Sequence, residues 1–186
     1  MKLQGYYGKE TETVVQGNTE FALDLYRELK GREGNLFFSP YSISTALAMT
    51  YVGARGDSEM QMAQTLHFTL DQRRLHPAFA LLEAGLNAVQ ERGYILFRVA
   101  NTLWPQIGYA LLEEFLALTK EYYGVLITPV DYHDAETARR RINAWVEEKT
   151  EDRIKDLIEP GVLSELTLLV LVSAIYFKGD WASQFD

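Results

Sequence analysis

The sequence predicts an α+β protein in which helices pack on a sheet. Three observations predict this class. A run without charged side chains, from Leu168 to Phe177, has the length and the Val, Ile, Tyr and Phe content of a strand buried on both faces. Apolar residues recur at helical spacing along much of the chain before it. Two other stretches, 94–104 and 125–130, are further candidate strands.

Six helices are expected from apolar spacing and from capping and helix-breaking residues. Their ranges are Asn18 or Thr19 to Lys30, Pro40 to Val52, Ser58 to His67, Asp71 to Arg92, Leu111 to Gly124 and Ala135 to Thr150. Residues 1–17 are expected to be a flexible amino terminus or the start of the first helix. Asn35 to Ser39 is expected to form a short apolar strand.

The stretch Ala135 to Thr150 is the clearest amphipathic helix. One side carries the apolar residues Ala138, Ile142, Trp145 and Val146, and the opposite side carries Arg139, Arg140 and Glu147. The helix is therefore expected to bury the first side and to expose the second to water.

Composition limits the class of protein. A chain of 186 residues with 47% hydrophobic side chains is typical of one globular domain. A formal net charge of −8 argues against general binding to nucleic acid or to an anionic membrane. The absence of cysteine excludes disulfides and thiolate metal sites. The amino terminus lacks the apolar core of a secretory signal, which indicates a cytoplasmic protein or the mature form of a secreted one.

The strand from Leu168 to Phe177 also predicts that the domain is incomplete. A strand buried in a sheet needs a partner on each edge, and the sequence after it is too short to supply a second one. Residues 1–186 are therefore expected to form a single, incomplete domain.

Several blocks of sequence occur in an order and spacing that resemble the amino-terminal half of a serpin, a member of the serine protease inhibitor superfamily. The blocks are Asn35 to Ser44, Gly53 to Gly56, Met62-Ala63, Leu66 to Phe68, Val99 to Asn101, Ile142 to Val146, Thr150, Ile154 to Leu157, Ala174 to Gly179, Trp181 and Phe185. The resemblance covers nearly all of the chain from Thr19 to Asp186.

The resemblance implies inhibition of a serine protease, or alternatively a cysteine protease, by a suicide-substrate mechanism. In serpins an exposed loop is attacked by the protease, forms an acyl-enzyme and inserts as a new strand into the large sheet. The strand from Leu166 to Gly179 would border the opening that receives the loop. The loop itself is absent from this chain, and the carboxyl-terminal half of the same fold is the other implied partner.

The resemblance also implies roles for individual residues. Ser39, Pro40 and Ser42 match the shutter region beneath the point where the sheet parts, and Ser173 belongs to the same region. Trp181 matches the tryptophan of the breach, where insertion begins. Asn143 and Trp145 match positions of the helix that lies across the sheet. Simpler interpretations are that the serines are ordinary cap and turn groups and that the tryptophans are core aromatics.

Two departures from the family pattern fall in these regions. The family usually carries asparagine before Ala174, where this chain has Ser173, which is shorter. The family usually has Asn-Gly after Thr150, where this chain has Glu151-Asp152, so a position suited to positive φ carries a side chain.

Other functions find little support in the sequence. No nucleophile elbow or phosphate-binding loop occurs, so no catalytic residue, no cofactor and no enzyme activity are expected. The three histidines, His67, His76 and His133, lack ligand spacing, so no metal site is expected. Heparin binding is not expected, because Arg73-Arg74 and Arg139 to Arg141 are the only basic clusters in an acidic chain.

Two alternatives to an inhibitor remain open at this point. One is a non-inhibitory serpin that acts as a binding or carrier protein. The other is a truncated product of 186 residues without inhibitory activity, which would expose the unpaired edge of the strand from Leu168 to Phe177.

Overall fold

The computed structural model describes residues 8–90 and 95–179. The chain divides into two compact units, Met1–Leu86 and Asn87–Asp186. The helices and strands, in chain order, are α1 (Lys9–Leu29), α2 (Pro40–Tyr51), α3 (Asp57–Thr65), α4 (Gln72–Gln90), β1 (Ile95–Pro105), α5 (Glu113–Tyr123), β2 (Leu126–Ile127), the 3-10 helix η1 (Tyr132–Asp134), α6 (Ala135–Lys149) and β3 (Leu169–Gly179). The expected class, helices with a partial sheet, is confirmed.

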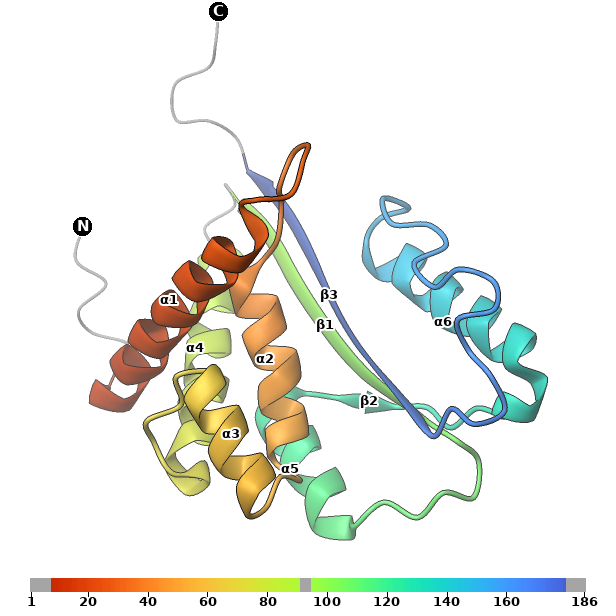
Figure 1. The fold of residues 1–186 in the computed structure, drawn as a ribbon, viewed down its shortest axis with the longest axis horizontal. Helices are drawn as coiled ribbons and strands as arrows, with labels where there is room; N and C mark the ends of the chain where they lie inside the picture. The colour runs from red at the N-terminus through yellow and green to blue at the C-terminus, as the bar shows by residue number, and fades with distance from the viewer. Residues whose placement is uncertain (1–7, 91–94, 180–186) are drawn as a thin grey trace, which may run out of the picture. The chain divides into compact units, whose positions relative to one another are not determined.

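In the first unit α1 packs against α2 (Figure 1). Gly17 of α1 lets the backbone at His67, in the turn after α3, approach α1 closely. A Cβ at position 17 would lie 2.4 Å from the carbonyl oxygen of His67. The His67 ring lies between two carboxylates of α1, with Nδ1 3.2 Å from Glu20 and Nε2 2.8 Å from Asp24. The turn after α3 is therefore fastened to α1 by both backbone packing and side-chain contacts.

Two expectations for the first unit were wrong. Helix α1 starts at Lys9 and not near Asn18, because Thr11, Val14 and Gly17 continue the buried face further toward the amino terminus, so residues 9–17 belong to the first helix, as the second alternative for residues 1–17 had it. Residues 35–39 form no strand, since none of the described residues pairs with them. Phe37 is 97% exposed, as expected of an apolar stretch without a neighbouring strand.

The second unit contains a three-stranded sheet of order β2-β1-β3. β1 and β3 pair antiparallel along their whole lengths, from Ile95↔Gly179 to Pro105↔Leu169. β2 is much shorter than the expected strand 125–130 and pairs parallel to β1 through Leu126 and Ile127. Among the described residues β3 is an edge strand, and on it only Val172 and Ala174 are buried, so burial on both faces is not observed.

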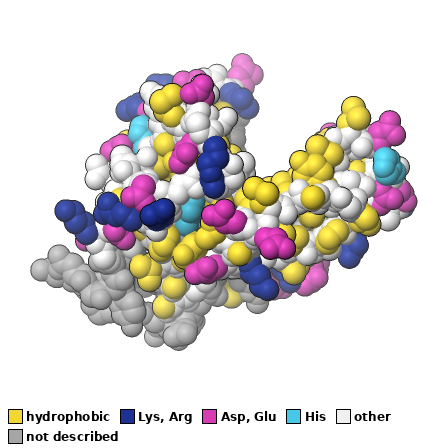
Figure 2. Space-filling view, turned by 90° about the horizontal axis from the view of Figure 1, so that it is seen from below, with side chains coloured by type: hydrophobic (Ala, Val, Ile, Leu, Met, Phe, Trp, Pro, Cys, Tyr) yellow, Lys and Arg dark blue, Asp and Glu magenta, His cyan; other side chains and the backbone are white. Residues whose placement is uncertain are grey.

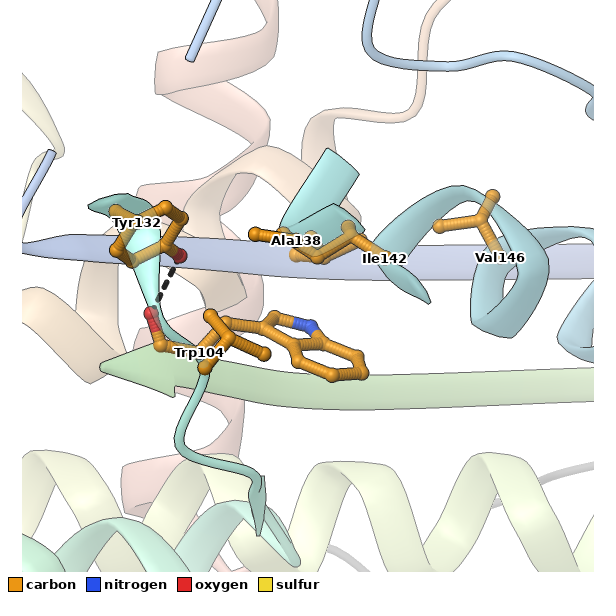
Figure 3. Packing of buried hydrophobic residues seen from close by; sticks show 7 residues of the cluster. Trp104, Tyr132, Ala138, Ile142 and Val146 are labelled. Atoms are coloured by element: carbon orange, nitrogen blue, oxygen red, sulfur yellow. Dashed lines mark hydrogen bonds between the residues drawn. The ribbon is translucent and has the colours of Figure 1, made fainter. Parts of the chain in front are cut away.

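Helix α6 packs on this sheet through a compact apolar core (Figure 3). The core consists of Trp104, Val130, Tyr132, Ala138, Ile142, Val146 and Val172. The Tyr132 hydroxyl donates a 2.7 Å hydrogen bond to the Trp104 carbonyl oxygen, which joins η1 to the end of β1. Residues 150–168, here named the return segment, connect α6 to β3 without a helix or strand.

Burial shifts the pKa values of two side chains of the first unit in opposite directions. Burial, helped by the nearby Arg55 charge, lowers the pKa of His76 to about 4. Burial raises the pKa of Glu83 to about 7. On acidification from pH 6.5 toward 4, the unfolded chain binds a proton at His76 that the folded chain does not, so this contribution lowers stability as pH falls. Glu83 has the opposite effect, because its folded form keeps a proton that the unfolded chain loses above pH 4.5.

We expect substitution of these two residues to change the pH dependence of stability in opposite directions. Between pH 5 and pH 7, His76 raises the free energy of unfolding of the wild type and Glu83 lowers it, each by about 1 to 2 kcal/mol. Over this range His76→Gln should therefore gain less stability than the wild type, and Glu83→Gln should gain more. Urea unfolding of both variants and of the wild type at pH 5 and pH 7 measures this. Shifts of the same sign in both variants would contradict the assignment.

Candidate functional site

The first group of candidate residues lies at the start of α2. Ser39 is the N-cap of this helix, and its Oγ accepts a 3.2 Å hydrogen bond from the backbone N–H of Ser42. Pro40 occupies the first helical turn, where its missing N–H leaves no helical bond unmade. Ser44 and Thr45, one turn further on, are fully buried. Helix capping therefore accounts for Ser39 and Pro40 within the first unit.

Ser173 lies on β3 in the second unit. It is paired in register with Asn101 of β1, whose side chain is buried and donates a 3.4 Å hydrogen bond from Nδ2 to the carbonyl oxygen of Tyr123. Ser173 and Asn101 are thus cross-strand neighbours on β3 and β1. The structure describes Ser173 in a different unit from Ser39 and Ser42, and Trp181 lies outside the described residues.

Asn143 connects α6 to the return segment. Its Oδ1 accepts a 2.9 Å hydrogen bond from the Ile158 N–H, and its Nδ2 donates a 2.9 Å hydrogen bond to the Ile158 carbonyl oxygen. The side chain therefore satisfies both backbone groups of one residue, as a neighbouring strand would. Helix α6 is positioned for this by the Asp134 cap, whose Oδ1 accepts from the Thr137 N–H.

Trp145 contributes to the apolar core of α6. Its ring meets Trp104 of β1 edge to face, with centroids 6.3 Å apart and planes at 82°. The Arg141 guanidinium lies 5.9 Å from the centre of the Trp104 ring, within range of a cation–π contact. The apolar side expected for this helix is confirmed by the burial of Ala138, Ile142 and Val146 (Figure 3).

Arg139 was expected to face water, and this was wrong. Its side chain is only 12% exposed, and its Nη1 donates a 2.9 Å hydrogen bond to the Ile158 carbonyl oxygen. The signal that could have found it is its spacing, because Arg139 precedes Asn143 by four residues and therefore shares a helix face with it. Nothing local in the sequence identifies Ile158 as the common partner.

Hydrophobic side chains also reach the surface of the described residues (Figure 2). In the return segment Leu157, Val162 and Leu166 are 50%, 65% and 82% exposed. No described helix has the length and apolar character needed to cross a membrane. The described part of the chain also places no three His, Cys, Asp or Glu side chains together in a way that could hold a metal ion.

Comparison with protein families gives a match over most of the chain. The family model described as serpin (serine protease inhibitor) matches residues 16–186. Leukocyte elastase inhibitor of Sus scrofa is 46% identical over 177 residues, which cover 94% of this chain and 46% of that protein. An uncharacterized serpin-like protein of Thermococcus kodakarensis is 44% identical, covering 95% of this chain and 41% of that protein. The chain thus spans about half the length of the curated relatives that it matches.

Solved structures give the same result. The structure of ovalbumin from emu, Dromaius novaehollandiae, matches with a TM-score of 0.81 at 31% identity, covering 94% of this chain and 49% of that one. A highly specific serpin of the insect Tenebrio molitor matches with a TM-score of 0.84 at 30% identity, covering 96% of this chain and 48% of that one.

We expect Asn143→Ala to lower the free energy of unfolding by about 1 to 3 kcal/mol, because it leaves the Ile158 N–H without its acceptor. Chemical denaturation measures the loss. Glu148→Ala, an exposed position on the same helix, is the matched control and should change stability by less than about 0.5 kcal/mol. Equal effects of the two substitutions would show that the Ile158 contacts contribute nothing.

The two residues after Thr150 adopt left-handed backbone conformations, with φ of 51° at Glu151 and 58° at Asp152. This confirms the expectation that residues with a side chain occupy positive φ after Thr150. We expect Glu151→Gly to stabilise the protein by about 0.5 to 1 kcal/mol, because glycine adopts this conformation without a Cβ penalty. Asp152→Gly should gain less, since aspartate tolerates this region better. Thermal unfolding of both variants measures the gain, and a loss of stability in Glu151→Gly would contradict it.

Proposed function

Since the chain belongs to the serpin family, we propose that it is the amino-terminal portion of a serine protease inhibitor that traps its target by inserting a loop into the central sheet. The observation that carries the proposal is the family match over residues 16–186 together with relatives named leukocyte elastase inhibitor. An elastase-like serine protease is therefore the first target to test.

The geometry of the second unit supports a role as the sheet that accepts the loop. β3 pairs with β1 along one edge, and no described strand pairs with its other edge. Backbone N–H and C=O groups on such an edge bind an added strand through ladder hydrogen bonds, with little dependence on its sequence. In this proposal the reactive loop and the strand beyond β3 come from the other half of the family fold.

The proposal assigns roles to the residues that match the family pattern. Ser39, Pro40 and Ser42 of the first unit and Ser173 of the second take the positions of the family's shutter region. Trp181 takes the position at which the loop enters, and Asn143 and Trp145 belong to the helix that covers the sheet. The polar groups at the start of α2 support this, because Ser39 already acts as an acceptor for a backbone N–H and hydroxyls can exchange partners when strands part. The protein in this proposal is a substrate of its target and carries no catalytic residue of its own.

The first experiment is an intact mass of the natural gene product, compared with the 21.3 kDa of this chain. We expect a substantially larger mass, because loop insertion needs the missing half. That product is then incubated with an elastase, and a complex that survives denaturing electrophoresis at about the summed mass is expected, since the acyl linkage is covalent.

The control for this experiment is the same elastase with its active-site serine chemically blocked, which should give no complex. A gene product that is cleaved without forming a complex with any serine protease would contradict the inhibitory mechanism and favour a binding or carrier role. A product of 21.3 kDa that nevertheless inhibits would contradict loop insertion.

A further inference from the structure

The return segment is an irregular stretch held against a helix. Residues 150–168 form no helix or strand, although they connect two of the longest elements of the second unit. Connections of this length without secondary structure are uncommon in compact folds and are often functional. The contacts that hold the segment in place therefore decide what it can do.

Those contacts converge on one residue of the segment. The backbone of Ile158 makes three hydrogen bonds of 2.9 Å to side chains of α6, two to Asn143 and one to Arg139. Both side chains donate to the same Ile158 carbonyl oxygen. Between Glu159 and Thr167, by contrast, the backbone hydrogen bonds found join residues of the segment to one another, as in Val162 to Glu159. The Lys155 ammonium also lies 3.0 Å from the Glu147 carboxylate of α6, and the Asp152 N–H donates to the Glu147 carbonyl oxygen. Among the contacts found, Ile158 is the residue of the segment with the most hydrogen bonds to side chains of α6.

Arg139 is held in position to make this contact. Its Nε and Nη2 donate to the two carboxylate oxygens of Glu136 at 2.9 and 2.8 Å, which leaves Nη1 for Ile158. The Asp156 carboxylate lies 3.7 Å from the same Nη1. A planar guanidinium with one edge fixed by a carboxylate is a preorganised donor. The hydrogen bond to Ile158 is therefore charge-assisted.

The attached segment is also strained. Asp156, two residues before Ile158, has a φ of 49°, a left-handed conformation that costs energy for residues with a side chain, although aspartate tolerates it better than most. Such conformations persist only where the surrounding contacts enforce them. Release of Ile158 would let Asp156 relax, so the attached and released states of the segment are alternative arrangements of the same chain.

We propose that Arg139 and Asn143 form a latch on Ile158, and that Arg139 sets how readily the return segment leaves α6. This proposal rests on the proposed inhibitory function, in which the helix over the sheet yields as the loop enters. The segment joins α6 directly to β3, so α6 cannot move away from β3 while the latch is closed without carrying the segment with it. Arg139 is accordingly a positioning residue that governs the speed of sheet opening.

Hydrogen exchange of the natural gene product, followed by mass spectrometry, tests the latch. Arg139→Met keeps the apolar stem and removes the donors, and Arg139→Lys restores a positive charge and a single ammonium group without the planar fork. Arg140→Met is the matched control, because exposed Arg140 makes a side-chain hydrogen bond only to Thr137 among the contacts found for it.

We expect amides of residues 153–160 to exchange at least tenfold faster in Arg139→Met, less so in Arg139→Lys, and at the wild-type rate in Arg140→Met. Peptides from 95–105 and 169–179 should keep their wild-type protection in all three variants, which shows that the sheet remains folded. Unchanged exchange of residues 153–160 in Arg139→Met, or equal increases in Arg139→Met and Arg140→Met, would overturn the latch.

The second readout is inhibition, measured under conditions in which the wild type yields both the covalent complex and cleaved, released inhibitor. A faster release of the segment speeds loop insertion, so the ratio of complex to cleaved inhibitor should rise at least twofold in Arg139→Met and stay unchanged in Arg140→Met. An unchanged or lower ratio in Arg139→Met would overturn the control of sheet opening by Arg139. If the wild type forms no complex with any protease, the proposed function is wrong, and the exchange rates alone still decide whether the latch exists.

Discussion

The antiparallel pairing of β1 with β3 is the interaction on which the second unit depends. It runs without interruption from Ile95↔Gly179 to Pro105↔Leu169. Trp104 is paired with Val170, and Val172 follows two residues later on the same face, where α6 packs. A slip of one residue would turn Val170 and Val172 away from α6 and leave Ala138, Ile142 and Val146 without their partners. The register of one pair of strands thus determines where the helix can lie.

The sequence predicted the elements that have strong periodic or compositional signals. The uncharged run at β3 and the apolar stripe of α6 are both present in the structure. It misplaced the start of α1, because the small residues Thr11 and Gly17 are buried there by packing and not by their own hydrophobicity. It predicted a strand at 35–39 from apolar content alone, although a strand exists only where another strand pairs with it.

The site was predictable only in part, for a related reason. Asn143 could be singled out by its position in a family pattern, but its partner Ile158 lies 15 residues further on, in an irregular segment. Arg139 was assigned to the solvent side because charge usually indicates exposure, although Glu136, three residues earlier, stands at the spacing of a helical ion pair. Side-chain hydrogen bonds to distant backbone groups leave no periodic signal, whereas packing faces do.

The length and separation of the two paired strands have a consequence for synthesis of the protein. Partners in the β1–β3 ladder are roughly 60 to 85 residues apart in sequence, so the sheet has a high contact order. At typical translation rates β1 leaves the ribosome about 4 to 15 s before β3 is complete. During that interval its eleven residues have backbone groups without their ladder partner and side chains such as Leu103 and Trp104 without their final cover. The nascent chain therefore exposes β1 to non-native pairing until β3 is made, and slower translation between the two strands lengthens that exposure.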